Sequence, residues 1–104
     1  MKLEITREHI KNGIPGDASY CAIACAVAEK YKVPSDWVGV EGSDNIFIST
    51  TDYWLELDVS NEDRQPINDF INDFDSIENM EDERIELYRN TLPEISFNYK
   101  EIRR

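Results

Sequence analysis

The sequence predicts a single α+β domain over residues 1–104, in two layers, with an antiparallel sheet of four to five strands and helices on one face. A chain of 104 residues with 40% hydrophobic content supplies one hydrophobic core. Alternating apolar residues, typical of strands, occur near both ends and in the middle of the chain. Apolar residues at helical spacing occur between them. The predicted order is strand, helix, helix, three strands, helix, helix and strand.

The first third of the chain predicts a short strand followed by two helices. In the segment KLEIT, apolar residues alternate with charged ones, as in a strand with one buried face. Thr6 is suited to cap a short helix over REHIKN, and Gly13 to end that helix in the left-handed conformation. After a glycine-proline turn, Asp17 or Ser19 is expected to cap a helix rich in alanine, which Pro34 ends.

The middle of the chain changes to a period of two residues. Three short runs rich in β-branched and aromatic residues are separated by GSD and TTD, which predicts a three-stranded antiparallel meander. Its buried face is expected to contain Trp37, Val38, Val40, Ile46, Ile48, Tyr53, Leu55, Leu57 and Val59.

The last third predicts two acidic helices and a closing strand. The first helix shows an apolar stripe at positions i, i+3, i+4 and i+7, formed by Ile67, Phe70, Ile71 and Phe74. The second is expected around residues 80–90, packing through Ile85, Leu87 and Tyr88. In the tail EISFNYKEI, apolar residues alternate, which predicts a strand that pairs with a part of the sheet already formed.

Negative charge is the most unusual property of the chain. There are 22 acidic residues against 11 basic ones, so the formal net charge is −11. From Asp58 to Glu86 there are eleven acidic residues against two arginines, a balance of 2 − 11 = −9. Repulsion disfavours direct binding to nucleic acid or to an anionic membrane, and it favours a basic partner.

The acidic helices are therefore the expected partner-binding surface. Its candidate residues are Glu62, Asp69, Asp73, Asp75, Glu78, Glu81, Asp82 and Glu83. Carboxylates along a helix can imitate the phosphates of a DNA strand, which follow one another about every 3.4 Å, and so compete for a basic groove that binds nucleic acid. An acidic face that only keeps the protein solvated is an equally good interpretation.

The two cysteines do not predict an enzyme. Cys21 lies near an expected helix start, where the helix dipole can lower the pKa of a thiol. Nucleophilic catalysis also needs a base, and the only histidine, His9, lies in no signature of a thiol hydrolase. Cys21 and Cys25 share one helix face, as small core residues do, and a zinc site would need two further ligands. We expect no catalytic residue, no metal and no cofactor.

The segment GIPGDAS supports a second hypothesis, from a different class. A turn before a helix can present free backbone N–H groups to an anion. The chain could then be a small-ligand binder that sequesters a nucleotide signal, through Gly16, Asp17, Ser19, Tyr20 and Trp37. Against this, the turn lacks the lysine of a phosphate-binding loop, and its own polar side chains can satisfy those N–H groups.

The segment ITREHIKNGIPGDASYCAIACAV, together with the closing EISFNYKEI, resembles a group of small, uncharacterised bacteriophage proteins. In that group a similar turn leads into a helix that opens with cysteine and small apolar residues. The resemblance implies a phage or prophage protein that acts in the cytoplasm of its bacterial host, and the charged N-terminus agrees with the expectation that no signal peptide is present. The acidic segment around residues 76–91 departs from the pattern.

These observations lead to one functional hypothesis. We expect a non-enzymatic acidic protein that binds and inhibits a basic host protein, either a defence protein or a nucleic-acid-binding protein. Nucleic-acid mimicry is the proposed means. No direct contact with nucleic acid or membrane is expected, and the sequence predicts no oligomeric state.

Overall fold

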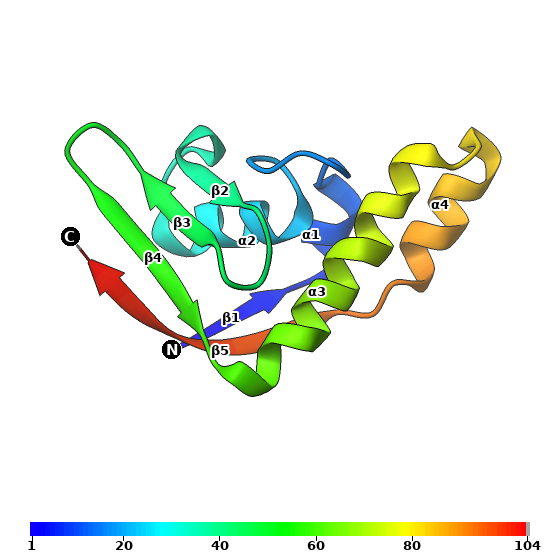
Figure 1. The fold of residues 1–104 in the computed structure, drawn as a ribbon. Coiled ribbons are helices and arrows are strands. Elements are labelled where there is room, and N and C mark those ends of the chain that lie inside the picture. Colours follow the sequence, from blue (N-terminus) through cyan, green and yellow to red (C-terminus); the bar gives the residue numbers. More distant parts are fainter. Residues whose placement is uncertain (104) are drawn as a thin grey trace.

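The computed structural model describes residues 1–103 and has the α+β fold that the sequence predicts (Figure 1). Five antiparallel strands form one curled sheet in the order β1-β5-β4-β3-β2. The strands are β1 (Lys2–Ile5), β2 (Val38–Val40), β3 (Ile46–Ser49), β4 (Trp54–Val59) and β5 (Ile95–Arg103). The helices are α1 (Arg7–Asn12), α2 (Ala22–Tyr31), α3 (Asn61–Asp75) and α4 (Asp82–Thr91), with short 3₁₀ turns η1 (Ser35–Trp37) and η2 (Ser76–Asn79).

The closing strand β5 holds the sheet together. Its first half, residues 95–98, pairs with β1, and its second half, residues 99–103, pairs with β4. At the junction, the N-terminal amine of Met1 donates to the carbonyl of Tyr99, and the N–H of Tyr99 donates to the carbonyl of Met1, both at 2.9 Å. The prediction that the tail forms a strand paired with earlier parts of the sheet is confirmed.

The hydrophobic core lies on one face of the curled sheet, under the helices. Along β4 the side chains of Leu55, Leu57 and Val59 are buried and alternate with half-buried neighbours, so only one face is covered. The other strands add Leu3, Ile5, Val38, Val40, Ile46, Ile48, Phe97 and Tyr99. The helices cover these residues with Ile10, Ala22, Ile23, Ala24, Val27, Ile67, Phe70 and Phe74. The two-layer architecture is therefore confirmed.

Three residues that were expected in the core are exposed. Trp37 lies in the η1 turn and is 42% exposed, because β2 begins only after it, at Val38. Tyr53 lies in the turn before β4 and is 36% exposed. Leu87 is 70% exposed, because Ile85 and Tyr88, three residues apart on α4, already point toward the core.

The turn into α2 differs from the prediction in its caps. The helix begins after Cys21, and Oδ1 of Asp17 instead accepts the N–H groups of Ser19 and Tyr20 in the preceding turn. Gly13 has extended backbone at φ −70°, not the left-handed conformation. A Cβ at Gly13 would lie 2.6 Å from the backbone nitrogen of Ala22, so glycine is required because α1 ends directly against α2.

The side chain of Arg89 joins α4 to the end of α1 by hydrogen bonds. Its Nη1 donates to the carbonyls of Ile10, Lys11 and Gly13 at 2.9, 3.1 and 2.8 Å. Its guanidinium also lies 5.8 Å from the ring centroid of Phe74. Carbonyls at a helix C-terminus lack partners within the helix and carry partial negative charge, so a cation there is favourable.

Replacing Arg89 by methionine tests this contact. Arg89→Met keeps an unbranched helix-forming side chain but leaves the carbonyls without their charged donor. We expect it to lower the free energy of unfolding by about 1.5 to 3 kcal/mol, measured by urea denaturation. Arg84→Met, at an exposed position of the same helix, is the control and should change the value by less than about 0.5 kcal/mol. Equal losses in the two variants would contradict this role of Arg89.

Candidate functional site

Residues 61–91, which we call the acidic arm, comprise α3, η2 and α4. Figure 1 shows α3 starting near the end of β4 and leading to α4, which lies at the opposite end of the molecule from the β3–β4 hairpin. The apolar stripe of α3 is packed into the core through Ile67, Phe70 and Phe74, so the polar residues of this helix face outward. The arm thus carries its negative charge on the surface.

All eight predicted partner-binding residues lie on the acidic arm. Glu62, Asp69, Asp73, Glu78, Glu81, Asp82 and Glu83 are exposed, and Asp75 is half-buried. Within residues 1–103, none of these eight carboxylates forms an ion pair with a lysine or arginine. Like charges four residues apart, such as Asp69 and Asp73, repel each other by a few tenths of a kcal/mol. The fold therefore leaves this charge uncompensated.

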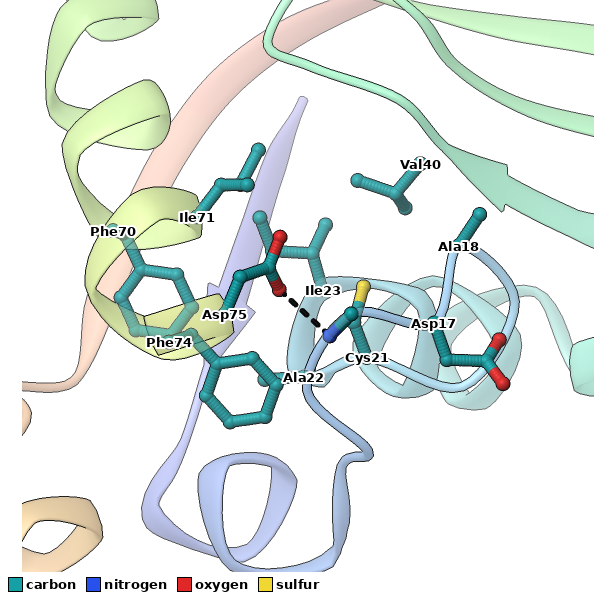
Figure 2. A pocket seen from close by; sticks show the side chains of 11 residues that line it. Asp17, Ala18, Cys21, Ala22, Ile23, Val40, Phe70, Ile71, Phe74 and Asp75 are labelled. Atoms are coloured by element: carbon teal, nitrogen blue, oxygen red, sulfur yellow. Dashed lines mark hydrogen bonds between the residues drawn. The ribbon is translucent and has the colours of Figure 1, made fainter. Parts of the chain in front are cut away.

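A cavity of about 110 Å³ lies between the turn before α2 and the last turns of α3 (Figure 2). Its residues come from three separate parts of the chain: Gly16, Asp17, Ala18, Cys21, Ala22, Ile23, Val40, Phe70, Ile71, Phe74 and Asp75. Most of these side chains are apolar, and the rings of Phe70 and Phe74 are stacked with centroids 5.9 Å apart. The sequence did not predict this cavity, because no local pattern indicates that these segments meet.

Asp75 links the cavity to the acidic arm. Its Oδ1 accepts the N–H of Gly16 at 2.9 Å, and Figure 2 shows its carboxylate between the phenylalanine side and the Cys21 side of the cavity. Gly16 has φ +77°, and a Cβ there would collide with the carboxylate of Glu78. The structure therefore brings Gly16 and Asp17, predicted for a small ligand, together with Asp75 and Glu78, predicted for a protein partner.

The other residues that were predicted to bind a nucleotide do not line this cavity. Ser19, Tyr20 and Trp37 do not line the cavity, and the hydroxyl of Tyr20 donates to Asp36. Three N–H groups of the turn are already bonded: that of Gly16 to Asp75, and those of Ser19 and Tyr20 to Asp17. Because the cavity is also lined by two carboxylates, its electrostatics oppose an anionic ligand. Nucleotide binding stays a prediction that this geometry does not favour.

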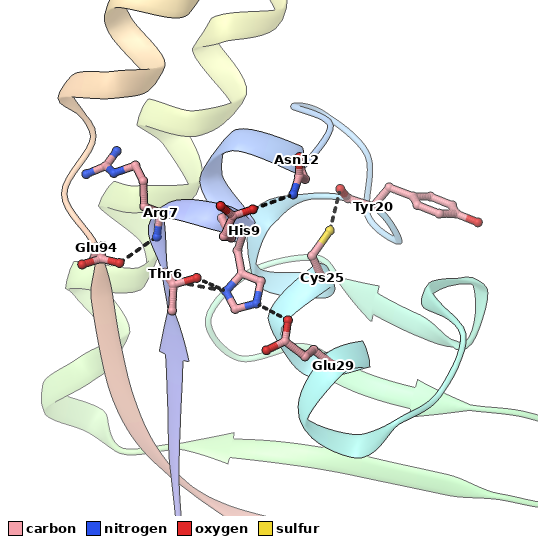
Figure 3. Close-up of polar contacts among 9 residues, drawn as sticks. Thr6, Arg7, His9, Asn12, Tyr20, Cys25, Glu29 and Glu94 are labelled. Atoms are coloured by element: carbon pink, nitrogen blue, oxygen red, sulfur yellow. Dashed lines mark hydrogen bonds and ion pairs between the residues drawn. The ribbon is translucent and has the colours of Figure 1, made fainter.

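His9 has a structural role (Figure 3). Its ring is buried, and Nδ1 accepts the backbone N–H of Thr6 at 2.9 Å, within the cap of α1. Its Nε2 lies 3.0 Å from the carboxylate of Glu29 on α2. The N–H of Thr6 fixes Nδ1 as the acceptor, so Nε2 carries the proton and donates to Glu29. Both ring nitrogens are thus used to cap α1 and to join it to α2.

The two thiols have surroundings that suit packing. Cys21 is buried at the start of α2, and this burial raises the pKa of its thiol to about 11, although nearby backbone N–H groups act in the opposite direction. Sγ of Cys25 donates to the carbonyl of Tyr20 at 3.5 Å, and desolvation raises its pKa as well. The lowering of the Cys21 pKa that a helix start can cause is therefore outweighed by burial.

Within residues 1–103, no three His, Cys, Asp or Glu side chains are grouped so that they could hold a metal ion. None of the helices there has the length and apolar content to cross a membrane.

Comparisons of this chain with protein-family models, with curated proteins and with solved structures found no match. The resemblance of residues 5–27 and 94–102 to small bacteriophage proteins therefore stays a prediction.

The pKa of Cys21 predicts a loss of stability in alkaline solution. The thiol has an ordinary pKa of 9.0 and a pKa of about 11 in the fold. Below pH 9 both states keep the proton, whereas between pH 9 and 11 the unfolded state loses it first, so the free energy of unfolding falls. We expect the free energy of unfolding of Cys21→Ala, measured by urea denaturation, to fall less between pH 8 and pH 10 than that of the wild type. Cys25→Ala, which removes the less buried thiol, serves as the control. If the free energy of unfolding of Cys21→Ala and of the wild type depended on pH in the same way, the raised pKa of Cys21 would be contradicted.

Proposed function

We propose that this chain is a non-enzymatic binding protein that docks through the acidic arm on a basic protein surface. The partner is a bacterial host protein, either a defence protein or another protein that binds nucleic acid. Occupying its basic surface inhibits the partner, because nucleic acid can no longer reach that surface. The observation that carries this proposal is the set of eight carboxylates on the arm that have no ion-pair partner within residues 1–103.

The distribution of charge supports a basic partner. The segment from Asp58 to Glu86 has a balance of −9, out of a net charge of −11 for the chain. A field of one sign concentrated on one surface raises the association rate with a partner of opposite charge, and this effect weakens as salt screens it. The same field opposes nucleic acid, so a protein is the favoured ligand.

An exposed apolar patch beside these charges supports binding over mere solvation. Leu87 lies with Met80, Arg84, Tyr88 and Thr91 along a shallow groove on α4. Binding surfaces commonly combine an apolar centre with a polar rim, and Leu87 with Met80 and Tyr88 lies among charged residues in that arrangement. Glu83 and Glu86 lie on the same helix and are exposed.

Charge reversal on the arm tests the proposal. The arm variant changes five exposed acidic residues to lysine: Asp69, Asp73, Glu81, Asp82 and Glu83. The control variant makes the same change at five exposed acidic residues elsewhere: Glu4, Glu8, Glu41, Asp44 and Asp52. Both variants have the same net charge, so a difference in the proteins that they capture depends on where the charges lie. Each immobilised protein is incubated with bacterial lysate, and the captured proteins are identified by mass spectrometry.

We expect wild type and control variant to capture the same basic protein, and the arm variant to lose it. Raising the salt concentration should release this protein, and added double-stranded DNA should compete for it. Capture by the arm variant at wild-type strength, or capture that is unchanged by both salt and DNA, would contradict the proposal.

A further inference from the structure

We propose that the cavity beside Asp75 receives one lysine side chain of the basic partner. This inference rests on the proposed function, and it names the part of the partner that the arm recognises. Exposed carboxylates give little affinity each, because water and salt screen them. A cavity that encloses one side chain can instead act as the energetic centre of an interface.

The walls of the cavity suit the methylene stem of a lysine. Phe70, Ile71, Val40 and Ile23 present apolar surface to the enclosed space. A lysine buries such a stem along apolar surface while its ammonium reaches a polar group. The cavity volume of about 110 Å³ is smaller than the roughly 150 Å³ at which an engineered apolar cavity accepts benzene. A single slender side chain is therefore a better occupant than an aromatic one.

Asp75 supplies the charge that an ammonium requires. Its Oδ1 is occupied by the N–H of Gly16, whereas in the part of the chain described here its Oδ2 has no hydrogen-bond partner. Partial burial destabilises a charged carboxylate that has no cation beside it, and a nearby ammonium offsets this cost. The resulting contact is a charge-assisted hydrogen bond, the stronger kind.

The geometry favours lysine over arginine and over any anion. Arginine binds best where several acceptors match its planar fork, but most of the side chains that line the cavity are apolar and Oδ1 of Asp75 is already occupied by the N–H of Gly16. The compact charge of lysine needs no such match. Asp17 also lines the cavity, and the Glu78 carboxylate lies against Gly16, so negative charge surrounds the site. The aromatic face of Phe70 or Phe74 is compatible with a neighbouring cation.

The site is held in place before a ligand arrives. The hydrogen bond from Gly16 orients the Asp75 carboxylate, and stacking of Phe74 on Phe70 fixes the opposite wall. The Arg89 guanidinium, 5.8 Å from the centroid of the Phe74 ring, makes a further contact with that wall. A preformed site loses less conformational entropy on binding than a flexible one. Asp75 should therefore contribute more to partner binding than Asp73, which is exposed two residues earlier.

Butylammonium chloride is the probe, because butylammonium reproduces the end of a lysine side chain. It is titrated into ¹⁵N-labelled protein, and amide chemical shifts are followed by NMR. We expect saturable shifts in the millimolar range at Gly16, Ala22 and Asp75. Butanol and butyrate, which have the same stem with no charge or a negative charge, should shift these amides at least tenfold more weakly.

Two variants and one control locate the probe. Asp75→Asn keeps an oxygen for the N–H of Gly16 but removes the charge, and we expect at least a tenfold weaker response. Ala18→Leu keeps the carboxylate and fills the mouth of the cavity, so it should also abolish the response. Asp73→Asn loses the same charge at an exposed position that does not line the cavity, and it should respond to butylammonium like the wild type. Dispersed amide spectra confirm that each variant is folded.

The inference is overturned if butylammonium gives no saturable shift, if butanol acts equally well, or if Asp75→Asn responds like Asp73→Asn. The captured partner gives the second readout: Asp75→Asn should retain it at least tenfold more weakly than Asp73→Asn does. Equal retention by these two variants would refute the lysine contact and leave the proposed function standing. Retention of the partner by the five-residue arm variant would instead refute the proposed function itself.

Discussion

The pairing of β5 with two strands is the constraint on which the rest of the structure depends. Residues 95–98 pair with β1 and residues 99–103 pair with β4, so one strand joins the start of the chain to the central meander. Without it, β1 would have no partner and the core face of the sheet would be divided. Because the acidic arm lies between β4 and β5 in the sequence, both of its ends are fixed to neighbouring strands.

The arm is also tied to the first two helices, at contacts far apart in the sequence. Arg89 on α4 reaches the carbonyls that end α1, and Asp75 at the end of α3 accepts the N–H of Gly16 before α2. Within a strongly acidic segment, Arg89 and Asp75 thus hold parts of the fold together. Asp63 is half-buried and accepts the N–H of Asn98, whereas the carboxylates of the arm other than Asp63 and Asp75 are exposed and solvent reduces their mutual repulsion.

This division gives neighbouring acidic residues different properties. Asp69 and Asp73 are exposed, so each adds to the field around the arm but little to any single contact. Asp75 is half-buried beside an apolar cavity, where a charge interacts more strongly with a ligand. Under the proposed function, the field attracts a basic partner and the cavity selects one of its side chains.

The sequence by itself determined the type and order of the elements, because hydrophobic periodicity is a local property that either fits a helix or a strand. It also located the acidic residues and the buried stripe of α3. Tertiary packing alone decided that Leu87 and Trp37 remain exposed, since each position depends on which neighbouring face meets the core. The cavity likewise exists only because residues near 16, 40 and 74 meet in space, and the sequence contains no local signal of that contact.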